Sequence, residues 1–529
     1  MFDKWLNLPA HYYLRITALF ILVVGVAVSN VLMSIGAIWI ISNWLIEAKF
    51  SEYGKRLKSS PEVILILFFL GFLVLSVAWS DDFWYAFHDV RIKLPLLAIP
   101  LALGTGKPLE RHVFFFLLYV FIGIVAYTAV YNYLNYLAAP AETDIRQMSV
   151  FISQIRFATL VDLALFSTVY LALEKKIKLF IALPLIAFFL FYTFYAQVLN
   201  GYILFVVLFA FTFLFALTKI KKPNVKWGIV LILVLVAISG GIYINRILKT
   251  YEGVDKFEYT DLAMYSENGN PYFHDTTNLT TENGHYVWLY VQPQELEKEW
   301  NERSEIAYDS LDRKNQPMFG TLLRYLTSKN ERKDSVGVWS LSEAEIEWIE
   351  NGSTGININN GLEAKIHSFL FEYEMYSGGA DPNGFSLLQR LEHLKAAREI
   401  LKEHWLFGVG IGDVDLHFQQ YYERTNSKLL PENRLRSHNQ FLASWIALGI
   451  LGFLITLAWF ITPLLQKSKR DYFLWITLCA LAVAFAFEDM LETQAGATIF
   501  ALFYSMAVFR APCGRNGTLN ADLPSYQNL

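Results

Sequence analysis

Three basic side chains, in or beside apolar helical patterns, are the first candidates for chemistry in this sequence. Arg156 lies in FISQIRFATLVDLALF, Arg390 in SLLQRLEHLKAAREILKEH, and His438 just before QFLASWIALGILGF. An ionisable group near lipid is costly to bury, so it usually faces a cavity or a partner, or it reaches the headgroups. Cations at the mouth of a bilayer helix favour a site for an anionic, lipid-borne substrate.

His438 has the most informative surroundings, because Arg434 and Arg436 precede it and Asn439 follows it. The N-terminus of a helix presents free N–H groups and a positive dipole end, which favour phosphate. A neutral imidazole, with an ordinary pKa of about 6.5, can take a proton from a hydroxyl nucleophile. Neighbouring arginines would disfavour the protonated form. An interfacial histidine that caps a helix is an equally good interpretation of the position alone.

Apolar residues at helical spacing predict an amphipathic helix around Arg390. Arg390 falls at the edge of the apolar stripe, whereas Arg398 falls near its middle. Either arginine can be a filler whose stem covers apolar surface, so the helical wheel does not choose between them. The residues expected in the stripe are Leu387, Leu391, Leu394, Leu401 and Trp405.

Two further features flank these candidates. The turn GVGIG, residues 408–412, does not have the G-x-G-x-x-G spacing and follows a helix. This favours a turn that returns the chain to the membrane over nucleotide binding.

Glu488, Asp489 and Glu492 lie between the last two apolar runs, in EDMLETQAG. The simplest interpretation of these carboxylates is a solvated turn; alternatively, one of them orients His438 or binds an acceptor hydroxyl.

The composition is that of a polytopic membrane protein. Of 529 residues, 54% are hydrophobic and only 17% are charged. The net charge of −4 gives no indication of nucleic-acid binding. The cysteines, Cys479 and Cys513, lie outside the large polar segment, which excludes a disulfide framework or a Cys-rich metal site there.

About twelve apolar runs have the roughly 20-residue length that a transmembrane helix needs. The first run lacks a convincing cleavage site and is interpreted as a retained helix. The predicted spans are 14–29, 31–47, 62–80, 92–104, 112–137, 151–173, 179–197, 200–218, 227–245, 439–463, 472–487 and 495–509.

Lysine and arginine predict the orientation, because short cytoplasmic loops retain an excess of them. They gather in segments 49–58, 175–178, 219–226 and 467–470, which fall on one side together with both termini. We therefore expect transmembrane helices 1–9 over residues 1–245, a mainly helical periplasmic loop domain over 246–437, helices 10–12 over 438–510 and a cytoplasmic tail over 511–529. Within the loop domain, helices are expected over 295–314 and 340–352, and a strand over 285–291.

The chain resembles the O-antigen ligase family, the Wzy-C superfamily of glycan ligases and polymerases. The matching pieces are Arg390 one helix upstream of LFGVGIGD, HNQFLASWIALGILGF from His438, and IRF at 155–157. The layout of the spans, with a large external loop between the ninth and tenth, also agrees, so the resemblance covers most of the chain. Trp405, Leu394 and Gln389 depart from residues that are common in the family.

The resemblance implies transfer of a glycan from undecaprenyl diphosphate to an acceptor hydroxyl at the periplasmic face of the bacterial inner membrane. It places diphosphate binding on Arg156 and Arg390, and the base on His438. Arg436, Asn439 and Glu488 are expected as auxiliary residues. No metal ion, nucleotide or other cofactor is implied. The expected partners are the lipid-linked glycan donor and an acceptor, with lipid A core as the leading choice.

Related chemistries stay open at this point, because the acceptor would contact the least readable segment of the chain. They are a Wzy-type O-antigen polymerase and a protein O-oligosaccharyltransferase. A lipid-linked glycan transporter is the alternative from a different class. It predicts repeated halves and polar residues at mid-membrane, whereas the candidate charges here cluster at one face.

Overall fold

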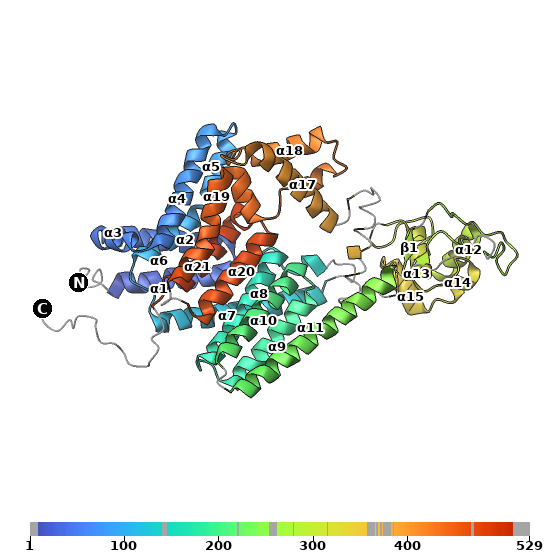
Figure 1. Cartoon of the computed structure of the whole chain (residues 1–529), viewed down its shortest axis with the longest axis horizontal. Helices are drawn as coiled ribbons and strands as arrows, with labels where there is room; N and C mark the ends of the chain where they lie inside the picture. The colour runs from blue at the N-terminus through green and yellow to red at the C-terminus, as the bar shows by residue number, and fades with distance from the viewer. Residues whose placement is uncertain are drawn as a thin grey trace. The chain divides into compact units, whose positions relative to one another are not determined.

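The chain forms two compact units, Met1–Lys219 with Gln389–Leu529, and Ile220–Leu388 (Figure 1). Cys513 and nearly all of the expected tail at 511–529 lie outside the described residues. The computed structural model describes residues 9–139, 145–219, 222–252, 262–278, 280–314, 316–356, 366, 369–370, 373, 382–383, 386–466 and 470–511.

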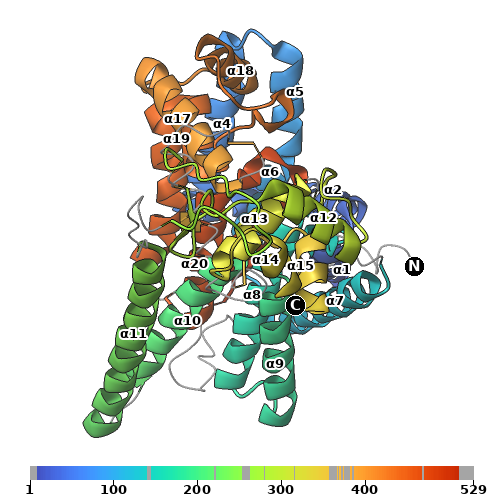
Figure 2. The same cartoon turned by 90° about the vertical axis from the view of Figure 1, so that its right-hand side faces the viewer.

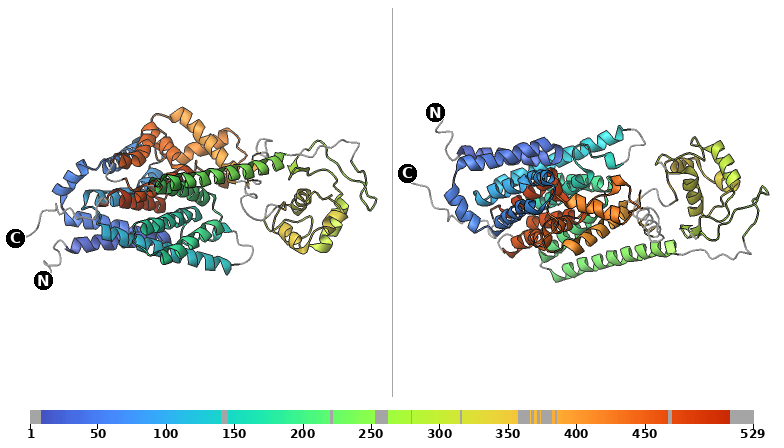
Figure 3. Two further views of the ribbon diagram at one scale, coloured as in Figure 1. Left: turned by 60° about the horizontal axis from the view of Figure 1, so that its bottom comes forward. Right: turned by 90° about the horizontal axis from the view of Figure 1, so that it is seen from above.

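The helices of the first unit pack side by side in one bundle (Figures 2 and 3). In chain order they are α1 (Pro9–Val28), α2 (Asn30–Glu47), α3 (Phe50–Lys58), α4 (Pro61–Ser76), η1 (Val77–Trp79), α5 (Phe83–Ile92), α6 (Leu94–Thr105), α7 (Arg111–Leu137), η2 (Ile145–Gln147), α8 (Gln154–Leu173), α9 (Leu179–Tyr195), α10 (Leu199–Lys219), α17 (Ser386–His404), α18 (Val414–Arg424), η4 (Pro431–Asn433), α19 (Gln440–Leu465), α20 (Tyr472–Phe487), η6 (Met490–Glu492) and α21 (Gln494–Val508).

Every apolar run predicted from the sequence falls on a helix. By length and composition, eight helices of the described part are able to cross a membrane, and α9, α20 and α21 are shorter apolar helices. The prediction of an all-α membrane protein is therefore confirmed at this level. The number of about twelve spans, which rests on the length of helix a bilayer needs, stays a prediction.

The centre of the first unit is formed by helices that are apolar on all sides. α21 is buried from Ala495 to Val508, and most of α8 is buried as well. α21 packs on α6 and α20, while α8 packs on α7, α9, α10 and α20. A helix that is hydrophobic all round belongs in the interior of a bundle. The charged residues at the ends of these helices are thereby brought together at the bundle's edge.

α19 is broken at Gly449, which has φ +66° and ψ −166°. The chain just after α17 fills the break with backbone hydrogen bonds. Val409 N donates to Ile446 O at 2.8 Å and Gly410 N to Ala447 O at 3.0 Å, while Ile450 N donates to Trp405 O at 2.9 Å. Backbone groups freed inside an apolar helix need such partners, because lipid offers none. The glycine turn thus joins α17 to α19 through its backbone.

The second unit contains α11 (Pro223–Glu252) and a small module around a core of large apolar side chains, Trp300 and Leu322 among them. The module consists of β1 (Thr281–Glu282), β2 (His285–Tyr286), α12 (Pro293–Arg303), α13 (Met318–Ser328), α14 (Ser335–Trp339) and α15 (Glu343–Glu350).

Sequence signals predict two of the four helices of this module, α12 and α15, and only part of the predicted strand is formed. The predicted helix at 340–352 is α15, and it begins with a capping box of Ser342 and Glu345. The predicted helix at 295–314 is α12, which ends at Arg303. The predicted strand at 285–291 pairs only over 285–286, across the Asn283-Gly284 turn. The loop-domain boundaries at 246 and 437 stay a prediction.

Replacing Gly449 by alanine is expected to lower the thermal stability of the first unit. The new Cβ would stand 2.1 Å from Leu406 O, a backbone atom, at a φ that L side chains rarely adopt. We expect a loss of about 2–4 kcal/mol, measured as a lower melting temperature in detergent. Gly123→Ala in α7 is the control, because nothing lies within 4 Å of its Cβ. Equal melting of the two variants would contradict this account of the break.

Candidate active site at the acidic turn

The short connection between α20 and α21 is the point at which the predicted site residues meet. We call residues 486–492 the acidic turn; it carries Glu488, Asp489 and Glu492. Arg156, Arg390, Arg436, His438 and Asn439 each make a hydrogen bond or ion pair with it. Since Glu488 belongs to the turn itself, the structure brings all of the predicted site residues together.

Arg156 lies in the first turn of α8 and faces the acidic turn. Its Nη2 donates to Glu488 Oε1 at 3.1 Å, and the two side chains are only 15% and 14% exposed. The Nε of Arg156 is buried and has no partner among the described residues. A guanidinium carries five N–H donors, so this arginine keeps donors for a further anion.

Arg390, on α17, contacts the acidic turn one residue before Glu488. Its Nη1 donates to Phe487 O at 3.4 Å. No described carboxylate forms an ion pair with it. Arg398 is exposed on the same helix. The structure therefore separates the two arginines that the helical wheel did not separate.

The predicted apolar stripe of α17 is wrong in part. Leu394 and Trp405 are 40% and 52% exposed. The buried face includes His393, because α17 packs against α18 and the start of α19 rather than along the predicted stripe (Figure 2). Small alanines let these helices approach closely. The buried residues of α17 are Leu388, His393, Ala396, Ala397 and Ile400.

His438 is held in an uncommon backbone conformation, with φ +49°. Its backbone N–H donates to Asp489 Oδ2 at 3.2 Å, and its ring lies 5.3 Å from the ring of His393. The imidazole nitrogens make no hydrogen bond with a described residue. Burial lowers the pKa of His438 to about 4, helped by His393 and Arg390. At neutral pH the ring is thus uncharged and keeps a free lone pair.

Asn439 and Arg436 act as positioning residues rather than as open ligands. Asn439 Oδ1 caps α19 by accepting from Leu442 N at 3.0 Å, and its Nδ2 donates to Ala486 O at 3.0 Å. Arg436 donates to Asp415, to Glu492 and to the hydroxyl of Tyr85, over whose ring it lies. The backbone on both sides of His438 is thereby fixed.

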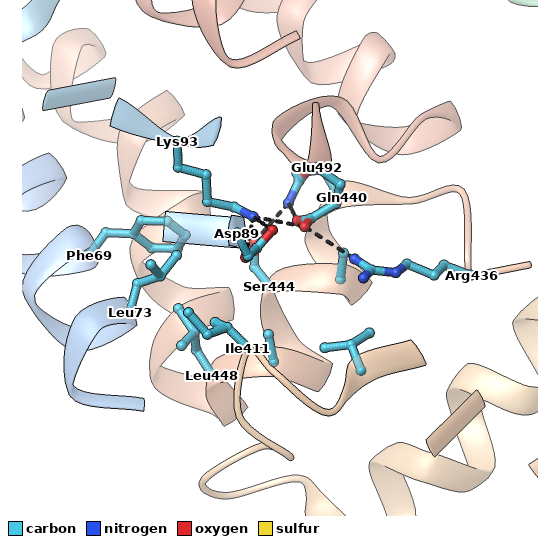
Figure 4. Close-up of a pocket in the computed structure, with 13 residues that line it drawn as sticks. Phe69, Leu73, Asp89, Lys93, Ile411, Arg436, Gln440, Ser444, Leu448 and Glu492 are labelled. Atoms are coloured by element: carbon cyan, nitrogen blue, oxygen red, sulfur yellow. Dashed lines mark hydrogen bonds and ion pairs between the residues drawn. The ribbon is translucent and has the colours of Figure 1, made fainter. Parts of the chain in front are cut away.

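A buried ionic network underlies the acidic turn (Figure 4). Lys93 Nζ lies 2.6 Å from Asp89 Oδ2 and 2.8 Å from Glu492 Oε2, and Arg436 Nη1 lies 3.2 Å from the same Glu492 oxygen. Gln440 Nε2 donates to Glu492 Oε1 at 3.2 Å. The sequence analysis missed this network. Its signal was a lysine inside the predicted span 92–104, one helical turn after an aspartate.

The interpretation of the acidic residues as a solvated turn is wrong. Glu488 and Glu492 are only 14% and 16% exposed. Burial and the nearby Glu492 charge raise the pKa of Asp489 to about 7. Burial also opposes the charge on Glu492, but Lys93 and Arg436 lower its pKa to about 2. Opposite charges decide which of these carboxyl groups ionises.

Among the described residues, no group of three or more His, Cys, Asp and Glu side chains is arranged to hold a metal ion. The chemistry that these residues themselves offer is charge neutralisation by arginine and proton transfer at an imidazole.

Residues 346–457 match the family model described as O-antigen ligase, Wzy_C. The predicted resemblance to the O-antigen ligase family is confirmed. The matched O-antigen ligase segment contains Arg390, Arg436, His438 and Asn439, whereas Arg156 and the acidic turn lie outside it. No curated protein matches the chain. The match indicates a membrane protein of the lipid-linked glycan ligase or polymerase class.

Replacing Lys93 by methionine is expected to destabilise the first unit. The change leaves Asp89 buried without its cation, and breaking a buried pair in this way costs about 3 kcal/mol or more. The loss should be smaller at low pH. Burial raises the pKa of Asp89 to about 6 even beside Lys93, and removal of the lysine raises it further, so Asp89 is neutral in the variant at low pH.

Thermal melting at pH 7.5 and pH 5 measures both effects. Lys402→Met is the matched control, because Lys402 pairs with Glu399 at 2.6 Å on the surface, with 55% and 37% of the side chains exposed. Exposed pairs contribute less than about 1 kcal/mol. Equal melting of the two variants would show that the network is not a source of stability.

Proposed function

We propose that this protein transfers a glycan from undecaprenyl diphosphate to an acceptor hydroxyl. The observation that carries the proposal is the convergence of three residues, far apart in the chain, on consecutive residues of the acidic turn. Arg390 bonds Phe487, Arg156 pairs with Glu488, and the backbone of His438 bonds Asp489. Three residues of chain reach about 10 Å at most. That span suits a diphosphate and the sugar attached to it.

The diphosphate is the part of the donor that the two arginines fit. Arg156 has a buried Nε without a partner, and no described carboxylate pairs with Arg390. Guanidinium groups present a rigid fork of donors that matches phosphate oxygens. As the bond from the sugar to the diphosphate breaks, negative charge grows on the leaving oxygen, and fixed cations stabilise it there.

His438 is the base in this proposal. The acceptor oxygen attacks the anomeric carbon of the sugar and its proton passes to an imidazole nitrogen, while the bonding electrons leave with undecaprenyl diphosphate. A single displacement of this kind inverts the anomeric configuration. A pKa of about 4 makes His438 a weak base before the donor binds. A bound diphosphate adds negative charge and offsets Arg390, which raises that pKa toward the operating pH.

The proposal includes the acceptor and the place of the reaction. We take lipid A core as the acceptor, the periplasmic face of the inner membrane as the location, and both termini as cytoplasmic. Purified protein supplied with lipid-linked oligosaccharide and, in turn, lipid A core, free glycan or a protein substrate tests the acceptor. Product with lipid A core alone supports a ligase. Product with glycan or with protein alone would assign the polymerase or the oligosaccharyltransferase instead.

Substitution of the arginines tests the diphosphate site. We expect Arg390→Ala to lower the rate of glycan transfer by about 10²–10³, the usual effect of losing one oxyanion donor. Arg156→Lys should restore only part of the activity that Arg156→Ala loses, because an ammonium lacks the guanidinium fork. Arg398→Ala is the control on the same helix and should transfer at the parental rate. Parental transfer by Arg390→Ala would remove Arg390 from the site.

The base is tested with a variant that preserves the backbone. Asparagine tolerates the left-handed conformation of residue 438, so His438→Asn should fold normally. It lacks a group that takes up a proton, and we expect a loss of about 10²–10⁴ in rate. Melting temperature and transfer rate are measured on the same sample. Normal folding with full activity would exclude His438 as the base.

The pH dependence follows from the lowered pKa of His438, which must be neutral to act. His393, Arg390 and Asp489 face it. kcat/KM reports the pKa values of the free protein. We expect it to stay constant as the pH falls to about 5, because His438, with a pKa of about 4, is still neutral there. The limb of kcat should lie at higher pH, because the bound donor is anionic. Asp489→Asn identifies any limb that belongs to Asp489. Identical histidine limbs near pH 6.5 in both profiles would contradict this assignment.

A further inference from the structure

A second polar pocket lies among the first helices of the bundle. It has a volume of about 380 Å³, within the range of ligand sites. Helices α1 and α2 and the connections that follow α2 and α6 form it. Its lining residues are His11, Tyr12, Arg15, Glu47, Lys49, Lys107 and Glu110. None of them belongs to the acidic turn or to the network beneath it.

This pocket lies at the opposite end of α21 from the acidic turn. α21 begins two residues after Glu492, and at its far end Phe509 O accepts from Leu109 N at 3.1 Å. Leu109 directly precedes Glu110, a lining residue of the pocket. A helix of 15 residues rises about 22 Å. The pocket therefore opens near the other membrane face of the bundle.

The charged side chains of the pocket that form no ion pair are positive. Both oxygens of Glu47 are occupied, by Lys49 Nζ at 2.8 Å and by the Tyr53 hydroxyl at 2.8 Å. Arg15 Nη1 donates to Lys107 O at 2.8 Å, and the buried Nε of Arg15 has no partner among the described residues. No described carboxylate pairs with the exposed ammonium of Lys107.

Glu110 is the remaining carboxylate, and it accepts from the Tyr12 hydroxyl at 3.3 Å. His112 Nδ1 also lies 3.3 Å from the same oxygen. Arg15 and Lys107 thus share a backbone contact, and neither forms an ion pair with a described carboxylate, although the charges of Glu47 and Glu110 act on Arg15 from a greater distance.

The surface beside the pocket is apolar, which favours the headgroup of a lipid over a soluble anion as the ligand. Residues one or two positions along the chain from the lining residues are large, hydrophobic and exposed, and α1 and α2 are long enough to span a membrane. The exposed apolar residues are Tyr13 (64%), Leu14 (38%), Leu45 (51%), Ile46 (68%) and Phe50 (53%).

We propose that this pocket binds the phosphate headgroup of an anionic membrane phospholipid. The free edge of the Arg15 guanidinium and the Lys107 ammonium bind the phosphate oxygens. The acyl chains then lie along the exposed apolar surfaces of α1 and α2. A basic pocket at the edge of a helical bundle is the kind of site that takes such headgroups. This inference does not depend on the glycan-transfer proposal.

Lipid binding to the purified full-length chain tests the inference. Native mass spectrometry would count bound phosphatidylglycerol and phosphatidylcholine over a matched concentration series. We expect the parental protein to prefer phosphatidylglycerol. Lys107→Gln should weaken its binding about fivefold, the contribution of one basic residue near a membrane surface. The double variant Arg15→Gln/Lys107→Gln should lose the preference. Lys55→Gln, an exposed lysine of α3 outside the pocket, should leave it unchanged.

Three results would each overturn the inference. The first is equal binding of both lipids by the parental protein, and the second is an equal effect of Lys107→Gln and Lys55→Gln. The third is full displacement of phosphatidylglycerol by equimolar glycerol 1-phosphate, which would assign the pocket to a soluble phosphate ester. Arg15 also holds the backbone of Lys107, so the double variant is judged only if its melting temperature is parental. Lys107→Gln alters an exposed ammonium and decides the question alone if the double variant does not fold.

Discussion

Glu492 lies between Lys93 and Arg436, and the geometry of the candidate site depends on that arrangement. A carboxylate with 16% of its side chain exposed keeps its charge only because two cations and Gln440 compensate for the lost water. These partners come from the start of α6, the segment before α19 and α19 itself. One charged group thus holds three parts of the chain at the end of α20. The acidic turn has a fixed position for that reason, and Arg156, Arg390 and His438 are placed relative to it.

The sequence predicts the elements and the site residues for a simple physical reason. Helices in a membrane are long and apolar, and a charge near their ends is rare enough to stand out. Each predicted run is accordingly a helix, and Arg156 and His438 lie at helix starts. Arg390 was found through the family resemblance rather than through its helical wheel. A helical wheel finds the buried face only where the most apolar stripe is the buried one. In α17 the buried face is instead the one that carries His393, which packs against other protein segments.

What the sequence does not predict is the pairing of residues far apart in the chain. Lys93 and Glu492 lie 2.8 Å apart but are separated by most of the protein. The loop EDMLETQAG has a polar composition, and only the packing of α21 on α6 and α20 shows that its carboxylates are enclosed. The break in α19 is another example, because Gly449 in an apolar run gives no sign that the 405–410 backbone fills it.

Two kinds of cation can be distinguished around the acidic turn, and they differ in how far nearby carboxylates already compensate their charge. In the network, Lys93 and Arg436 each contact two carboxylates, so an incoming anion would have to displace a partner. At the rim, Arg390 has a carbonyl contact and Arg156 keeps an unpaired Nε. A diphosphate would supply the charge that these two lack. In the proposed reaction the same added charge would make the uncharged imidazole of His438 a stronger base, so donor binding would be coupled to proton transfer through electrostatics.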